Sequence, residues 1–307
     1  MKNATLRQLR TFAAVARHLS FVRAAQELHL TPPAVTMQVK ELEAEVGLPL
    51  FDRAGKTVSL TTTGEYLLSY TRRVLSTLKD AEDAIARFKG LQGGQVTVGL
   101  VSTAKYFMPS LMARFRDEHP GIEVRMKLGN RELLVALMQR NEVDLAVMGR
   151  PPKEWATRAE PFAQHPHVLV TAPDHPFTRL DQVPAMALQN EGFIVREPGS
   201  GTRAAMDEYV AEHRLALRVV MEMASNETIK QAVMAGMGVS FLSLHTLGLE
   251  LRHGLIATPE VEGLPVMRRW HVVNNLAKLL SPAAEAFRYF VLEHGQGHLG
   301  QMLERIN

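Results

Sequence analysis

One segment in the N-terminal part of the chain, Thr31 to Lys40, carries side chains suited to recognition chemistry. It reads Thr-Pro-Pro-Ala-Val-Thr-Met-Gln-Val-Lys. The major groove of duplex DNA offers donors, acceptors and thymine methyl groups, and a glutamine can pair with adenine through two hydrogen bonds. Basic side chains nearby suit phosphate contact, which positions a protein without specifying sequence. We predict a base-reading helix, although a solvated helix face is the alternative for any one residue. The candidate DNA-binding residues are Arg23, Thr31, Pro33, Ala34, Thr36, Met37, Gln38, Lys40, Arg53 and Lys56.

A second set of polar residues follows predicted strands further along the chain. Ser102 and Thr103 come at the end of a buried strand, and the loop from Glu197 to Arg203 enters a helix. Free backbone N–H groups and the helix dipole make such places anion sites, and clefts in α/β proteins lie at the carboxyl ends of strands. Simple helix capping by Ser102 and Ser200 is the alternative, and it is compatible with binding. The candidate effector-binding residues are Ser102, Thr103, Lys105, Asn130, Arg150, Ser200, Gly201, Thr202, Arg203 and Asn226.

Catalytic and metal-binding motifs are absent from the sequence. Gly199-Ser-Gly201 lacks the downstream glycine and Lys-Ser/Thr pair of a phosphate-binding loop. Neither a Gly-x-Ser-x-Gly elbow nor a His-Glu-x-x-His helix occurs. The histidine pairs at 165/167 and 294/298 have spacings that could hold a metal, but neither has a third ligand at a suggestive offset. We therefore expect no catalytic residues, no metal and no cofactor, and we expect a protein that is not an enzyme.

Three short helices are predicted to position the base-reading segment. Thr5 with Gln8 forms a capping box for the first helix, Ser20 caps the second, and Thr31 caps the third with Pro32 at its first position. In the third helix Val35, Val39, Leu42 and Val46 form the core face, which leaves Gln38 and its neighbours toward the open side. The helix-turn-helix spans about 22–41, and residues 52–61 form a basic hairpin, or wing.

A long helix is predicted next, opened by a capping box of Thr62 and Glu65 and running to about residue 90. Its apolar or small positions alternate in steps of four and three, which is the seam of a short coiled coil. We therefore predict dimerisation through it, with packing on its own domain as the alternative. The seam consists of Leu67, Thr71, Val74, Leu78, Ala81, Ile85 and Phe88.

From residue 95 onward, strands and helices alternate in a way that is typical of a parallel sheet. Strands are expected at 95–101, 123–129, 144–148, 167–172, 193–196, 218–223, 238–243 and 267–274, and a closing helix at 281–293. We predict an effector-binding domain over 91–307 with two α/β lobes. Lobe I covers about 95–164 plus 268–307, and lobe II about 165–267.

Composition limits the class of protein. The 307 residues are 46% hydrophobic and include no cysteine, which excludes disulfides and thiolate metal sites. Residues 1–90 hold 13 Lys/Arg against 9 Asp/Glu, whereas the remainder holds 22 against 23, so the basic excess lies at the end predicted to bind DNA. Neither a secretory signal nor an apolar stretch long enough to cross a membrane is found. We expect a soluble, cytoplasmic protein that does not bind membranes.

Residues 5–61 resemble the winged helix-turn-helix of the LysR-type transcriptional regulators, and the resemblance continues through the linker helix and the two-lobed part. The residues that carry it are 6–12, Ser20-Phe21, Ala24-Ala25, Leu28, 33–36, Gln38-Val39, Leu42-Glu43, 47–53, Leu60-Thr61 and Gly64. The stretches 98–107, 149–152 and 226–233 look most like regulators of CO2-fixation (RuBisCO, Calvin-cycle) operons. One departure is Met37, where many members carry arginine, and it leaves the base preference open.

The resemblance implies a winged helix-turn-helix over 1–62 that is mainly α, a linker and dimerisation helix over 63–90, and an effector domain like periplasmic binding proteins. It implies a homo-oligomer, typically a tetramer, that binds double-stranded DNA and a small anionic effector, with RNA polymerase as a further candidate partner. Phosphorylated sugars, phosphoenolpyruvate or NADPH are the effectors it suggests, and activation is the regulation it favours.

Other functions compete with this interpretation. A LysR-type regulator of a different metabolic operon would share the same features. A solute-binding protein would share the two lobes, but it needs an export signal and has no use for residues 1–90. A two-domain α/β enzyme would need a catalytic constellation that the sequence lacks.

Overall fold

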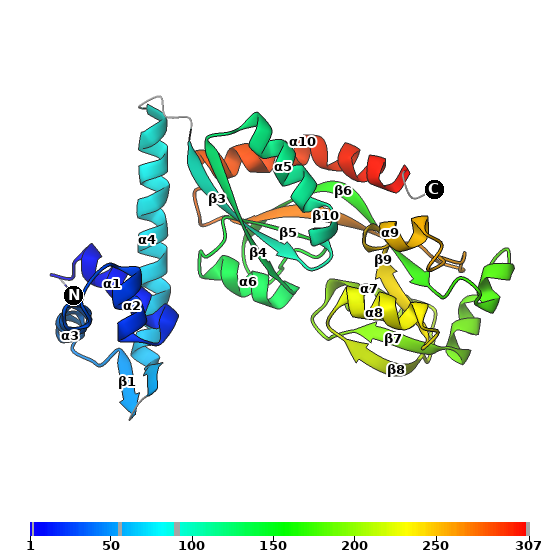
Figure 1. Cartoon of the computed structure of the whole chain (residues 1–307), viewed down its shortest axis with the longest axis horizontal. Coiled ribbons are helices and arrows are strands. Elements are labelled where there is room, and N and C mark those ends of the chain that lie inside the picture. Colours follow the sequence, from blue (N-terminus) through cyan, green and yellow to red (C-terminus); the bar gives the residue numbers. More distant parts are fainter. Residues whose placement is uncertain (2, 55–56, 89–92, 305–307) are drawn as a thin grey trace. The chain divides into compact units, whose positions relative to one another are not determined.

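The structure is a computed structural model that describes residues 1, 3–54, 57–88 and 93–304. The side chains of residues 53, 54, 80, 83, 84 and 86–88 lie outside this description. The chain divides into two compact units, one made mainly of residues 1–85 and the other mainly of residues 86–307. Figure 1 shows them in blue to cyan and in green to red. Each unit is described by itself below.

The first unit is a helix-turn-helix with a two-stranded wing. It contains α1 (Leu6–His18), α2 (Phe21–Glu27), α3 (Pro32–Val46), β1 (Phe51–Ala54), β2 (Thr57–Leu60) and α4 (Thr62–Phe88). The predicted caps are confirmed: Thr5 and Gln8 form a complete capping box, and Ser20 and Thr31 accept hydrogen bonds from the first turns of α2 and α3. Local side-chain chemistry thus determines where each of these helices begins.

The core face predicted for α3 is also confirmed. Val35, Val39 and Leu42 have no exposed surface and pack with Phe12 of α1 and Ala24 of α2. The cap predicted for α4 is wrong by one residue, because Thr61, not Thr62, accepts the hydrogen bond from the N–H of Gly64 at 3.0 Å. Gly64 must be a glycine there, since a Cβ would lie 2.1 Å from the Leu50 carbonyl oxygen.

The second unit is built on one mixed sheet of eight strands in the order β4-β3-β5-β10-β6-β9-β7-β8 (Figure 1). The strands are β3 (Gly94–Val101), β4 (Ile122–Gly129), β5 (Leu145–Met148), β6 (Thr157–Val170), β7 (Gly192–Arg196), β8 (Arg218–Met223), β9 (Val239–Ser243) and β10 (Val266–Asn275). The prediction of a parallel sheet holds for β4-β3-β5 and β8-β7-β9. It is wrong for β6 and β10, which run antiparallel to their neighbours.

Separate hydrophobic cores define the two lobes of this unit. In lobe I, α5 (Met108–Glu118) and α10 (Pro282–Glu304) pack around Trp270, Phe115 and Phe287, and α6 (Arg131–Gln139) packs on Val143 and Val273. In lobe II, α7 (Gly201–Glu212) and α8 (Asn226–Met234) belong to two further clusters. The long strands β6 and β10 pair along their length and run from one lobe into the other.

Short helical segments complete the unit. The 3-10 helices are η1 (Ala104–Tyr106), η2 (Pro176–Arg179), η3 (Ala185–Asn190) and η4 (Leu244–Thr246), and α9 (Gly248–Arg252) follows η4. Among the described residues, no helix combines the length and apolar character needed to cross a membrane.

Two elements are longer than the sequence predicts. Strand β6 begins ten residues before the expected residue 167. The sequence prediction missed its first half because Pro161, Pro166 and two charged residues interrupt the apolar pattern there. Helix α10 continues to Glu304 instead of ending at Glu293, through three glycines that weaken the helical signal. Gly295 has a packing role there, since a Cβ would lie 2.3 Å from the Phe162 ring.

Candidate functional site

The outer face of α3 is open, as a base-reading helix requires. Pro33 and Lys40 are exposed, and Met37 is 57% exposed. A shallow groove along this face is lined by Pro32, Pro33, Thr36, Met37, Lys40, Glu41 and Ala44. The apolar Met37 side chain suits contact with a thymine methyl group, and Lys40 suits contact with a phosphate.

Gln38 does not share this face. The prediction that Gln38 lies toward the open side is wrong, because its side chain is 7% exposed and its Oε1 accepts a hydrogen bond from Thr11 Oγ1 at 2.5 Å. The bidentate pairing with adenine needs both the oxygen and the nitrogen of the amide. The Thr11 bond uses the oxygen, so Gln38 joins α3 to α1.

The remaining predicted DNA contacts fall into three groups. Arg23 and Thr31 are exposed, but Thr31 Oγ1 already accepts from the Ala34 N–H at 3.4 Å. Ala34 and Thr36 are half-buried, and the Thr36 hydroxyl donates to the Pro32 carbonyl at 2.9 Å. The side chain of Arg53 and the whole of Lys56 lie outside the described residues.

The predicted seam of α4 is only partly available to a partner. Val74 and Ile85 are 45% and 55% exposed, Ala81 is exposed, and Leu78 is half-buried. The assignment of Leu67 and Thr71 to an intermolecular seam is wrong for this unit, because Thr71 is buried and Leu67 packs on its core. The side chain of Phe88 lies outside the description. Exposed Tyr66 and Tyr70, which the prediction omitted, extend the apolar face.

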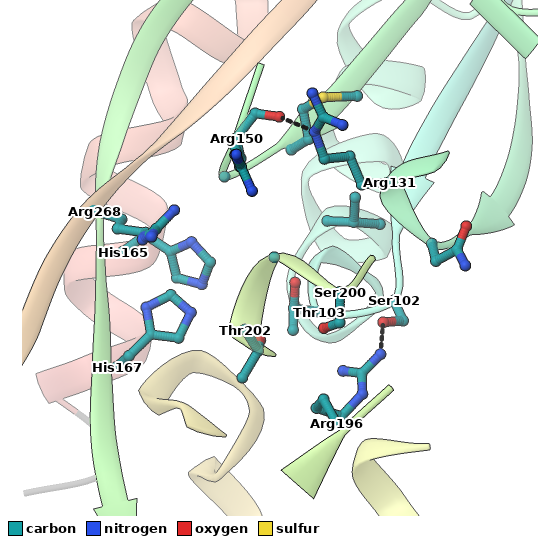
Figure 2. Close-up of a pocket in the computed structure, with 15 residues that line it drawn as sticks. Ser102, Thr103, Arg131, Arg150, His165, His167, Arg196, Ser200, Thr202 and Arg268 are labelled. Atoms are coloured by element: carbon teal, nitrogen blue, oxygen red, sulfur yellow. Dashed lines mark hydrogen bonds between the residues drawn. The ribbon is translucent and has the colours of Figure 1, made fainter. Parts of the chain in front are cut away.

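A cleft lies between the two lobes of the second unit (Figure 2). Seven of the ten predicted effector-binding residues line it: Ser102, Thr103, Asn130, Arg150, Ser200, Gly201 and Thr202. They follow the ends of β3, β4 and β5 in lobe I, or belong to the N-cap and first turn of α7 in lobe II. Strand ends from both lobes therefore converge on one space, as expected for an open α/β sheet.

Four arginines give the cleft its charge. Arg131, Arg150, Arg196 and Arg268 line it, whereas no Asp or Glu is among the described lining residues. Arg131 donates to the Arg150 carbonyl at 3.1 Å and to Glu154, and Arg268 pairs with Glu208. The Arg150 guanidinium is exposed and has no partner within the part of the chain that the structure describes. The cleft is thus suited to an anion.

Arg196 is the arginine held most rigidly. Only 3% of it is exposed, and it donates to Glu197, to Asn226 Oδ1 and, across the cleft, to Ser102 Oγ at 3.2 Å (Figure 2). Its charge is pre-positioned beside the space that a ligand would occupy.

The N-terminus of α7 adds uncharged donors. Ser200 is its N-cap but makes no capping hydrogen bond, and Ser200, Gly201 and Thr202 at this helix end all line the cleft, where backbone N–H groups of a first turn can serve as donors. The hydroxyls of Thr103, Ser200 and Thr202 belong to residues no more than 6% exposed, and none has a hydrogen-bond partner among the described residues. These donors favour an anion with several acceptor oxygens.

Ser102 and Thr103 do not cap a long helix, so the capping alternative considered for Ser102 is wrong. The chain after β3 forms the three-residue η1, and α5 begins only at Met108. Pro109 at the second position of α5 favours a start there. Ser102 and Thr103 therefore contribute their hydroxyls to the cleft, without the amides of a long helix.

Three predicted effector-binding residues do not line the cleft. Lys105 pairs with Glu227, and Arg203 pairs with Asp207 and Glu222. Asn226 is buried, and its side-chain oxygen accepts from Arg196. Arg203 and Asn226 sit behind Arg196 and support it, since Arg203 also donates to the Arg196 carbonyl at 3.1 Å.

Sequence reasoning missed five polar lining residues: Arg131, His165, His167, Arg196 and Arg268. Arg196 ends β7 directly before the predicted loop, so the strand-end rule could have found it. His165 and His167 were noticed only as a pair, because the first half of β6 had no strand signal. Burial lowers the pKa of His165 well below its usual value and that of His167 to about 3, so both rings are neutral at pH 7.

These features define a DNA-binding protein that carries a ligand-binding domain. The family model "Bacterial regulatory helix-turn-helix protein, lysR family" matches residues 6–65, and "LysR substrate binding domain" matches residues 89–296. The chain belongs to the LysR family of bacterial transcriptional regulators, and it is not an enzyme.

Relatives within the family are similar along nearly the whole chain. "HTH-type transcriptional regulator CfxR" of Cupriavidus necator is 51% identical over 98% of this chain and 95% of the relative. A "RuBisCO operon transcriptional regulator" of Allochromatium vinosum is 46% identical over 94% of this chain and 96% of its own. The regulatory domain of CcmR from Synechocystis, solved in complex with 2-PG, is 39% identical with a TM-score of 0.63, covering 65% of this chain and 96% of that one.

Proposed function

We propose that this chain activates a CO2-fixation operon in response to a small anion bound between the two lobes of its effector domain. The observation that carries the proposal is the cleft itself, which four arginines line without a carboxylate among the described lining residues. The relatives named for RuBisCO operon regulation and the CcmR domain solved with 2-PG support the same assignment.

The cleft chemistry favours a phosphorylated metabolite. The amides of Gly201 and Thr202 can donate to phosphoryl oxygens, while Arg196 supplies a buried charge on the same side. Arg150 and Arg131 can then neutralise a second ionised group near lobe I. NADPH is the alternative effector. Either effector would bind non-covalently and would not be a resident cofactor.

On the DNA side, we assign base contacts to the exposed face of α3, centred on Pro33 and Met37, and phosphate contacts to Lys40 and Arg23. The exposed apolar face of α4 pairs two copies, so paired α3 helices enter successive major grooves about one helical turn apart. The resulting dimers assemble into a tetramer that contacts RNA polymerase, and the protein acts in the cytoplasm.

An effector can regulate this assembly only if it binds one arrangement of the lobes more tightly than another. The direct bond from Arg196 to Ser102 provides such a difference, because it forms only when the lobes are close enough. An anion that contacts Arg196 and the Ser102 hydroxyl together would favour that arrangement and alter the spacing of the DNA-binding units.

The test uses the full chain with 2-PG, phosphoenolpyruvate and NADPH in thermal-shift titrations, followed by gel shifts on duplex DNA from upstream of a carboxylase operon. An effector should raise the melting temperature with concentration and change the DNA complex. Arg150→Gln should weaken the effector response, whereas Lys153→Gln, an exposed cation outside the cleft lining, should not. Failure to prefer the operon DNA over an unrelated promoter would refute the operon assignment.

A further inference from the structure

One wall of the cleft is made of two histidines, and three of their four ring nitrogens have no partner among the described residues. His165 and His167 are 4% and 1% exposed and occupy alternate positions of β6. Figure 2 shows both rings projecting from the strand toward the space that Thr103 and Thr202 border. Their ring centroids lie 4.2 Å apart, so they form one continuous surface.

The nitrogens on this surface are unsatisfied. His165 Nε2 shares a hydrogen bond with Ser243 Oγ at 2.9 Å, but His165 Nδ1 and both nitrogens of His167 have no partner among the described residues. Buried polar atoms in folded proteins are normally paired, so three unpaired nitrogens on two residues that line a cleft point to a ligand that completes them.

The surroundings keep both rings neutral. Arg268 of β10 lies opposite His165 in the strand register, His271 follows on the same strand, and His245 of η4 stands behind. Burial, followed by the charges of Arg268 and His245, lowers the pKa of His167 to about 3. A neutral imidazole carries one N–H donor and one lone-pair acceptor. His167 therefore presents an unpaired donor and an unpaired acceptor together.

A fully ionised anion can satisfy the donor but not the acceptor. An anion that carries a proton, such as a phosphomonoester with one P–OH group, satisfies both. We propose that the His165–His167 pair selects an effector whose anionic group binds together with a proton, held between an imidazole nitrogen and the effector oxygen. The inference rests on the anion cleft of the proposed function and names the chemical class that the cleft prefers.

Trp270 provides a direct readout of this contact. It stacks on the His165 ring with centroids 3.9 Å apart and an interplanar angle of 16°. The chain has two tryptophans, so Trp155→Phe in the full chain leaves Trp270 as the only indole that reports. A change in the fluorescence of Trp270 therefore reports binding at the histidine pair.

The test compares methyl phosphate with methyl sulfate at pH 6, two monoester anions of nearly the same shape. Methyl sulfate never carries a proton near neutral pH, whereas a phosphomonoester has its second pKa at about 6. Methyl phosphate should bind about tenfold or more tightly, because methyl sulfate leaves a buried acceptor unpaired. Its affinity should fall by about tenfold for each pH unit above 7, while methyl sulfate should show no such fall.

Variants of His167 assign the effect to the ring. His167→Phe keeps an aromatic ring beside Phe241 but removes both nitrogens, so the preference for methyl phosphate should disappear. His167→Gln keeps one donor and one acceptor and should restore most of it. Equal affinities for the two anions in the unsubstituted site would overturn the inference and leave the anion cleft intact. No response to either anion would overturn the cleft as an anion site as well.

Discussion

Arg196 and Ser102 belong to different lobes, and Arg196 Nη2 donates to Ser102 Oγ at 3.2 Å across the cleft between them. Behind Arg196, Glu197 and Asn226 fix the guanidinium, so the bond joins a rigid cation of lobe II to a hydroxyl of lobe I. An anion that contacts Arg196 and Ser102 uses or replaces this bond. Ligand occupancy and lobe arrangement are therefore linked through these two residues.

Removing the Ser102 hydroxyl tests this link without removing a charge. A hydrogen bond to a charged group contributes about 1.5–3 kcal/mol, so Ser102→Ala should weaken effector binding by about tenfold or more. Ser110→Ala is the matched control, because the Ser110 hydroxyl bonds to the Phe107 carbonyl within lobe I. Calorimetric titration of both variants with 2-PG measures the difference. An unchanged dissociation constant for Ser102→Ala would argue against the link.

Gln38 should act on stability and not on base preference. Gln38→Ala removes the partner of the buried Thr11 hydroxyl, so it should lower the free energy of unfolding by about 1–3 kcal/mol. Binding to all duplex sequences should then weaken together. Met37→Ala is the contrast, because an exposed side chain should alter base preference at little cost in stability. Thermal unfolding and binding to a panel of single-base variants separate these outcomes. Selective loss at one base pair in Gln38→Ala would restore the direct-reading role.

Two glycines of α10 should respond oppositely to alanine. At Gly295 a Cβ would lie 2.3 Å from the Phe162 ring, so Gly295→Ala should destabilise the effector domain by about 1–3 kcal/mol. At Gly297 a Cβ would meet nothing within 4 Å, so Gly297→Ala should stabilise it by about 0.5–1 kcal/mol through helix propensity. Chemical unfolding of the two variants measures both signs. Equal effects would mean that α10 does not pack on β6 as described.

The sequence could predict the first unit well because its signals are local. Caps such as Thr5, Ser20 and Thr31 and the apolar spacing of α3 depend on residues within a few positions of one another. Gln38 was misplaced because its burial depends on Thr11, 27 positions earlier. A polar residue at the edge of a core face has no local signal that tells burial from exposure.

The sequence could predict those cleft residues that follow strand ends. It could not predict those whose position depends on contacts between side chains. Ser200 and Thr202 followed from a strand-loop-helix pattern. Arg203 was expected in the cleft because it is cationic and close by, but two carboxylates of its own lobe hold it elsewhere. Arg268 and the two histidines come from the strands that join the lobes, and Pro166 hides the strand pattern there.

Acid should destabilise the effector domain through its buried histidines. Burial lowers the pKa of His167 to about 3 and that of His245 to about 4, whereas both titrate near 6.5 in an unfolded chain. Above pH 6.5 both states are neutral and nothing changes. As the pH falls below 6.5 the unfolded state takes up protons that the folded state does not. The free energy of unfolding should therefore fall by about 1.4 kcal/mol per pH unit for each ring, down to about pH 4.

Urea unfolding between pH 7.5 and pH 4.5 measures this slope. His167→Gln should make it shallower by about one proton, which is about 1.4 kcal/mol per pH unit. The difference between variant and parent at pH 7.5, where the ring carries no charge in either state, provides the baseline. Identical slopes in the two proteins would contradict the burial of a neutral His167.

Oligomerisation should depend on the C-terminal half of α4 and not on its first turns. Ile85 is 55% exposed, so Ile85→Glu should leave its own unit folded while it places a charge in an apolar interface between two copies. We expect the dimer to dissociate at micromolar concentrations and DNA affinity to fall, because a single α3 helix then binds alone. Glu82→Gln, an exposed substitution on the same helix, should change neither property. Analytical ultracentrifugation with parallel unfolding curves decides the question. Leu68→Ala, in contrast, should lower the stability of the unit, because Leu68 packs in its core. A dimer that survives Ile85→Glu would show that the interface does not lie on α4.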